Sequence, residues 1–131
     1  MQNLFIISTN STPAIYFNVR NGVLNIHGKS LPEDALKFYG SIDNQLDKFI
    51  SVFPDKTLLI TCEFEYINTS SSKVLYSILK KAVDNLEKVV IVWSYEEDDD
   101  EMKEQGEIFE DNLGVTFEYR LFHANKASTQ I

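Results

Sequence analysis

Runs of β-forming residues alternate with runs of helical spacing in this chain, and this alternation limits the fold more than any other feature. Residues 57–64, 89–93 and 115–122 are the β-forming runs, and 89–93 is continuously apolar. Strands separated by helices pair in parallel through crossovers, so these runs predict a partly parallel sheet. We expect 89–93 to be a central buried strand. Apolar Leu59 also favours a strand 57–64 that is covered on both faces.

The N-terminal part adds an antiparallel element. Residues 14–19 and 23–28 are β-rich and flank Asn21-Gly22, a dipeptide typical of tight hairpin turns. A helix is predicted to follow, with Ser30 as a possible cap, and to end near Pro54. We expect residues 1–13 and 124–131 to be irregular.

These patterns predict one α/β domain over residues 1–131. It begins with a β-hairpin, and alternating helices and strands then complete one mixed sheet with helices packed against it. A length of 131 residues fits a single domain.

Charge and cysteine content narrow the functional class. The net charge of −8 argues against binding to nucleic acid or to an anionic membrane. The single cysteine, Cys62, cannot form an internal disulfide, which favours a cytoplasmic protein. No signal peptide is evident, and no apolar run is long enough to span a bilayer.

Half of the acidic residues lie in residues 96–111, which contain ten Asp or Glu and one Lys. The spacing of Met102, Ile108 and Phe109 predicts a helix over 98–112 with a thin apolar stripe. An EF-hand loop needs spaced ligands and a central glycine, and this run has neither. We therefore interpret it mainly as the acidic first turn of a helix on a solvated face. Docking of a basic partner is the alternative.

Signatures of catalysis and metal binding are absent from the sequence. The glycines do not form a phosphate-binding loop, and neither His27 nor His123 has a Cys or His at ligand spacing. Cys62 is expected to be a small core residue. The sequence thus predicts no catalytic residues, no cofactor and no metal.

The junction between strand 57–64 and the next helix is the most informative stretch. Residues 68–72 read Asn-Thr-Ser-Ser-Ser, directly before a helical pattern. Asn68, Thr69 or Ser70 could cap the helix, and one such residue suffices. Free N–H groups at a helix start could also hold an anion or stabilise a phosphorylated side chain. Physical reasoning alone favours the cap and does not choose among the hydroxyl groups.

Three motifs resemble the SiaC family of bacterial regulatory phosphoproteins. They are residues 11–15 (STPAI), 28–33 (GKSLPE) and 66–71 (YINTSS), the last followed by Lys73. They cover roughly the first two-thirds of the chain in the expected order. The resemblance implies a fold similar to that of STAS-type anti-sigma-factor antagonists, with a phosphorylatable hydroxyl at a strand-to-helix junction.

The resemblance also implies a non-enzymatic partner switch. Thr69 would be the phosphorylated residue, modified by a dedicated protein kinase and restored by a PP2C-type phosphatase. The unphosphorylated form would bind and activate a diguanylate cyclase, with effects on c-di-GMP and biofilm formation. Asn68, Ser70, Ser71 and Lys73 would surround the phosphosite. The alternative is a small-molecule or anion-binding module, or a hydrolase, that uses the helix start at residues 68–72.

Overall fold

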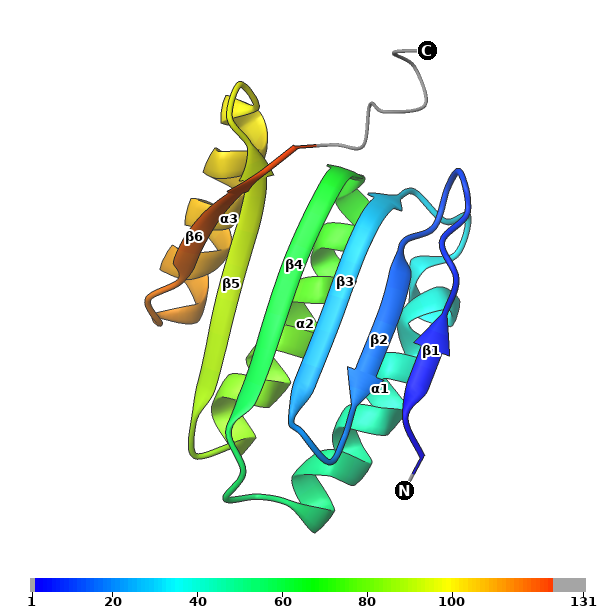
Figure 1. Ribbon diagram of the computed structural model, residues 1–131, viewed down its shortest axis with the longest axis vertical. Coiled ribbons are helices and arrows are strands. Elements are labelled where there is room, and N and C mark those ends of the chain that lie inside the picture. The colour runs from blue at the N-terminus through cyan, green and yellow to red at the C-terminus, as the bar shows by residue number, and fades with distance from the viewer. Residues whose placement is uncertain (1, 124–131) are drawn as a thin grey trace.

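The computed structural model describes residues 2–123, which form a six-stranded sheet and three helices (Figure 1). The expected α/β architecture is confirmed. The strands and helices, in chain order, are β1 (Leu4–Ile6), β2 (Ala14–Asn18), β3 (Val23–Ser30), α1 (Ala35–Val52), β4 (Leu58–Ile67), α2 (Thr69–Asn85), β5 (Val89–Glu96), α3 (Asp100–Leu113) and β6 (Glu118–Phe122).

The sheet is mixed, with its strands in chain order from β1 to β6. The β1–β2 and β2–β3 pairs are antiparallel, and all later pairs are parallel. The predicted hairpin is therefore β2–β3, and Gly22 has the positive φ of 67° that its turn requires. The apolar run 89–93 lies in β5, an inner strand, as predicted.

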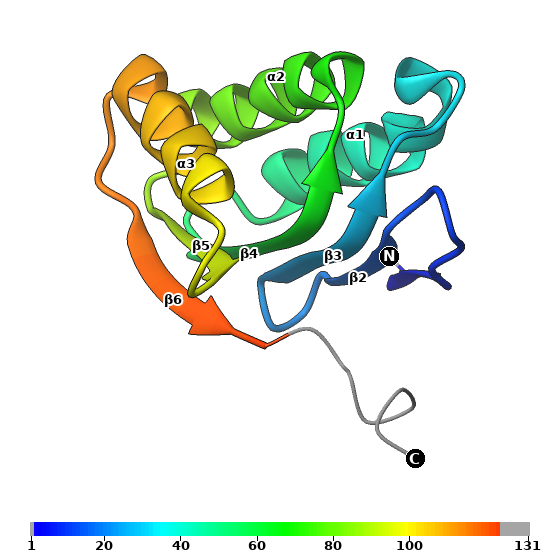
Figure 2. The same cartoon turned by 90° about the horizontal axis from the view of Figure 1, so that it is seen from above.

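All three helices pack on one face of the sheet (Figure 2). Alternate strand residues such as Ile60 and Ile91 are buried beneath them, with Tyr39, Leu46 and Leu79 of the helices. The expectation that β4 is covered on both faces is wrong, because all three helices lie on one face (Figure 2). Leu59 alternates with the buried Leu58 and Ile60, so it points to the other face, and it is 36% exposed. No helix within residues 2–123 has the length and apolarity needed to cross a membrane.

Part of the N-terminus that we expected to be irregular is a strand. Leu4–Ile6 pairs with β2, and Leu4 and Ile6 pack against the core. The short apolar run gains both ladder hydrogen bonds and burial by adding to the sheet edge. Residues 7–13 contain no helix or strand, and residues 124–131 lie outside the described part of the chain.

The start of α1 also differs from the expectation. Asp34, rather than Ser30, caps this helix, since its Oδ1 accepts a hydrogen bond of 3.1 Å from the amide of Lys37. Ser30 is the last residue of β3 and is fully buried. Strand pairing with β4 extends β3 beyond Gly28, so Ser30 contributes to the core instead of to a cap.

The acidic segment forms α3, with Asp99 as its cap and Asp100 and Glu101 in its first turn. This agrees with the interpretation of an acidic helix start. The apolar stripe is narrower than expected, because Met102 and Phe109 are buried whereas Ile108 is 54% exposed.

Candidate functional site

The candidate site is the junction at which β4 ends and α2 begins. Asn68 is the N-cap of α2, and its Oδ1 accepts a hydrogen bond of 2.9 Å from the amide of Ser71. The amide of Asn68 donates to the carbonyl of Ser30 at 2.9 Å. The cap is therefore anchored to the end of β3, which fixes where the first turn of α2 lies.

The hydroxyl residues of this turn are not equivalent. Ser71 is fully buried, and the hydroxyls of Ser30 and Ser71 are 2.9 Å apart. The hydroxyl of Ser30 also lies 2.6 Å from that of Tyr39. A consistent set of donors runs from Tyr39 to Ser30, from Ser30 to Ser71, and from Ser71 to the Ser30 carbonyl. Ser71 thus joins α2 to β3 and α1, and the fold closes it to a modifying enzyme.

Thr69 and Ser70 have the opposite environment, because both side chains are exposed. The hydroxyl of Ser70 donates to Asn68 Oδ1 at 3.3 Å, whereas within residues 2–123 that of Thr69 has no hydrogen-bond partner. The amides of Thr69 and Ser70 also lack partners within the described residues. These free N–H groups at the positive end of α2 favour a negative charge at this position.

Lys73 lies one helical turn after Thr69 on the same side of α2. The two residues line a hollow of about 300 Å³ between α2 and α3, together with Ser72 and Tyr76 of α2 and Gln105 of α3. The amide of Gln105 donates to the Ser72 hydroxyl at 3.4 Å. Lys73 is exposed and, within residues 2–123, is in no ion pair. An anion on Thr69 would therefore have a free ammonium group nearby.

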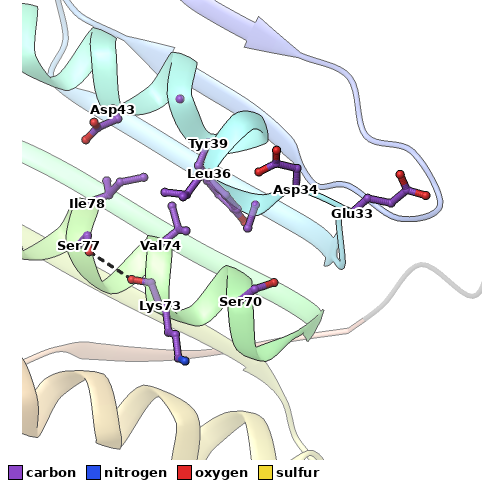
Figure 3. Close-up of a pocket in the computed structure, with 12 residues that line it drawn as sticks. Glu33, Asp34, Leu36, Tyr39, Asp43, Ser70, Lys73, Val74, Ser77 and Ile78 are labelled. Atoms are coloured by element: carbon purple, nitrogen blue, oxygen red, sulfur yellow. Dashed lines mark hydrogen bonds between the residues drawn. The ribbon is translucent and has the colours of Figure 1, made fainter.

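A second concavity lies on the other side of α2, between α1 and α2, and has a volume of about 530 Å³ (Figure 3). We call it the α1/α2 groove. In Figure 3, Leu36, Val74 and Ile78 lie between the two helices, and the Lys73 ammonium group points away from α1. Ser70 lines this groove and Thr69 does not. The predicted residues therefore divide between two sides of α2.

Sequence reasoning missed the α1 side of the groove. Gly40 weakens the helical pattern of α1, but that signal alone does not show that it borders a concavity. Leu36 fits the helical spacing of the apolar residues in α1, yet it is 75% exposed. Only the spacing of α1 and α2 in the fold reveals these residues.

The other residues with reactive or titratable side chains that we considered, Cys62 and Tyr39, have structural roles. Burial raises the pKa of the Cys62 thiol to about 12, so this cysteine is an unreactive core residue, as expected. Burial also raises the pKa of Tyr39, which stays protonated and available as a donor. Within residues 2–123, no group of three or more His, Cys, Asp or Glu is placed to hold a metal ion.

Comparisons with known proteins agree with this architecture. An uncharacterized protein of Pseudomonas aeruginosa strain UCBPP-PA14 is 28% identical over 120 residues, which cover 89% of this chain and 94% of that protein. The crystal structure of apo-SiaC from P. aeruginosa is 27% identical, with a TM-score of 0.77, over 94% of this chain and 100% of that chain. A chain in the structure of the P. aeruginosa diguanylate cyclase SiaD in complex with its activator SiaC is 27% identical. Its TM-score is 0.82, over 91% of this chain and 99% of that chain.

A comparison of the sequence with protein-family models identifies the family of this chain. A family model described as SiaC family regulatory phosphoprotein matches residues 6–122. This match covers the β2–β3 hairpin, the capped junction at Asn68 and all three helices. The chain is a regulatory phosphoprotein rather than an enzyme, and it belongs to the SiaC family.

Proposed function

We propose that this protein is a partner switch whose state is set by phosphorylation of Thr69. The observation that carries the proposal is the contrast between Thr69 and Ser71 in one helical turn. Thr69 is exposed at the first position of α2, whereas Ser71 is buried in a hydrogen-bonded network. Together with the family resemblance at residues 66–71, this contrast favours Thr69 as the residue that accepts the phosphate.

The physical effect of the phosphate follows from its surroundings. It would add nearly two negative charges beside the free amides of Thr69 and Ser70 and one turn before Lys73. These groups stabilise the charge locally, so we expect the fold to persist. The net charge of the residues that line the hollow between α2 and α3 would change from positive to negative, because Lys73 is the charged residue there. A partner that binds this surface would detect the change.

The partner that we propose is a diguanylate cyclase. SiaC of P. aeruginosa is described as the activator of the diguanylate cyclase SiaD. By analogy, the unphosphorylated form of the present chain would bind and regulate such an enzyme, with a cognate kinase and a PP2C-type phosphatase setting the phosphorylation state. These enzymes act on intracellular nucleotides and phosphoproteins, which favours the cytoplasm and a role in biofilm control through c-di-GMP.

Phosphorylation of the purified protein by a cognate protein kinase, followed by mass spectrometry, tests the site. We expect one phosphate on Thr69 and none on a Thr69→Ala variant. Ser70→Ala is the matched control, because Ser70 is the neighbouring exposed hydroxyl, and it should be modified like the wild type. A phosphate that stays on Ser70 or Ser72 in the Thr69→Ala variant would refute the assignment.

Binding to the regulated cyclase tests the switch. Thr69→Glu should weaken binding in calorimetry while the circular dichroism spectrum stays unchanged, and Ser70→Glu should weaken it less. Equal binding by Thr69→Glu and the wild type would contradict the proposal.

The alternative of an anion-binding module uses the same free amides. It predicts that inorganic phosphate binds the unmodified protein and that Lys73→Ala weakens this binding. The hollow beside Thr69, at about 300 Å³, is at the lower limit for small-molecule sites, which favours the protein-binding proposal.

A further inference from the structure

Gly40 lies in the second turn of α1, and no contact within residues 2–123 requires a glycine at this position. A Cβ atom at this position would meet no heavy atom within 4 Å, and Gly40 is not among the glycines with positive φ. Glycine inside a helix destabilises it relative to alanine, so Gly40 lowers helix stability without making room for any other part of residues 2–123. Gly40 lines the α1/α2 groove, where a missing side chain leaves the backbone open to close approach.

Leu36 lies one turn before Gly40 and is 75% exposed. With Val74 and Ile78 of α2, it gives the groove an apolar centre (Figure 3). Tyr39 and Ile78 are almost fully buried and form its floor. A groove between two neighbouring helices, apolar at its centre and open at a glycine, has the shape that accepts a third helix.

The charges around the groove indicate the chemistry of that helix. Glu33 and Asp34 line the end where α1 begins, and within residues 2–123 neither is in an ion pair. Asp43 also lines the groove, but Lys81 pairs with it at 2.6 Å. The one cation among the lining residues is Lys73, whose ammonium group points away from α1. The groove is therefore apolar with an acidic end.

We propose that the α1/α2 groove is a docking site for an amphipathic helix of a partner protein, with apolar side chains flanked by Lys or Arg. The charge complementarity argues against a second copy of this chain as the occupant, because its net charge is −8. The proposal goes beyond the phosphorylation switch. Thr69 does not line the groove, and docking does not require it to be modified.

Two synthetic peptides of about 18 residues, or five helical turns, test the chemistry of the occupant. Both carry leucine along one helical face, and lysine flanks this face in one peptide and glutamate in the other. We expect fluorescence anisotropy with the unphosphorylated protein to show binding of the lysine peptide and binding of the glutamate peptide that is weaker by about tenfold or more. No binding of the lysine peptide, or equal binding of both, would overturn the proposal.

Two leucine substitutions on the same helix test the location. Gly40→Leu fills the groove, and Ser41→Leu adds the same side chain at the next, exposed position, which does not line it. Gly40→Leu should weaken binding of the lysine peptide about tenfold or more, with Ser41→Leu within about twofold of the wild type. Similar binding by the two variants would show that the lysine peptide is attracted only to the overall acidic charge of the protein. This result would refute the α1/α2 groove as the binding site.

A further pair removes apolar contact without adding bulk. Leu36→Ala should weaken binding, and Ile108→Ala, which truncates another exposed apolar residue, on α3, should not. Light scattering provides the last check. A wild-type dimer that Gly40→Leu converts to a monomer would identify a second copy as the occupant and overturn the proposed partner. Circular dichroism of each variant confirms that it is folded.

Discussion

The buried network of Tyr39, Ser30 and Ser71 provides the sharpest test of how the junction is built. Ser71→Ala removes the acceptor of the Ser30 hydroxyl at 2.9 Å and the donor to the Ser30 carbonyl at 3.4 Å. The site is fully buried, so water cannot replace these bonds without reorganisation. Leaving a buried hydroxyl unsatisfied costs about 1–3 kcal/mol, so we expect a loss of that size in the free energy of unfolding.

Thr69→Ala is the matched comparison, since it removes an exposed hydroxyl two residues away. Its effect on stability should stay within about 0.5 kcal/mol, as for most surface substitutions. Urea titration of both variants, followed by circular dichroism, measures the difference. If the assignments are correct, Ser71→Ala lowers stability and is still phosphorylated, while Thr69→Ala keeps stability and loses phosphorylation.

A double-mutant cycle then shows whether the hydroxyls act as one network. Tyr39→Phe removes the hydroxyl that lies 2.6 Å from Ser30. The effects of Tyr39→Phe and Ser71→Ala should be non-additive by about 0.5 kcal/mol or more, because both share Ser30 as a partner. Additive effects, or a Ser71→Ala variant as stable as the wild type, would refute the reasoning.

Three further substitutions give independent checks. Burial raises the pKa of Cys62 from 9.0 to about 12, so the folded state holds this proton more tightly. The stability that this shift contributes is fully present below pH 9 and is lost between pH 9 and pH 12, at about 1.4 kcal/mol per pH unit. Cys62→Val should therefore make the free energy of unfolding fall less steeply with pH above pH 9. An unchanged dependence on pH would contradict this prediction. Gly106→Ala places a Cβ against the Trp93 ring, so it should lower the free energy of unfolding, measured by thermal denaturation, by about 1–3 kcal/mol. An unchanged stability would show that the Trp93 ring can move aside without loss of packing. Gly40→Ala should instead stabilise the fold by about 0.5–1 kcal/mol, and a destabilised variant would reveal an intramolecular role for this glycine.

The sequence predicted the elements whose signals are local. A β-forming run identified β4, a continuous apolar run identified β5, and Asn21-Gly22 identified the β2–β3 turn. The strand β1 was missed because three residues carry too little pattern, and it exists through its pairing with β2. Ser30 was misplaced because its capping propensity was outweighed by the parallel pairing of β3 with β4.

The candidate site shows the same division. The sequence by itself determined that a helix begins within residues 68–72 and that hydroxyl residues occupy its start, because capping and propensity act over a few neighbours. Only the tertiary structure decided that Ser71 faces the core while Thr69 faces solvent, since this depends on where β3 and α1 lie. It also placed Leu36 and Gly40 beside Val74 and Ile78 in one groove. Contacts between residues more than 30 positions apart depend on the packing of α1 against α2, which no local pattern encodes.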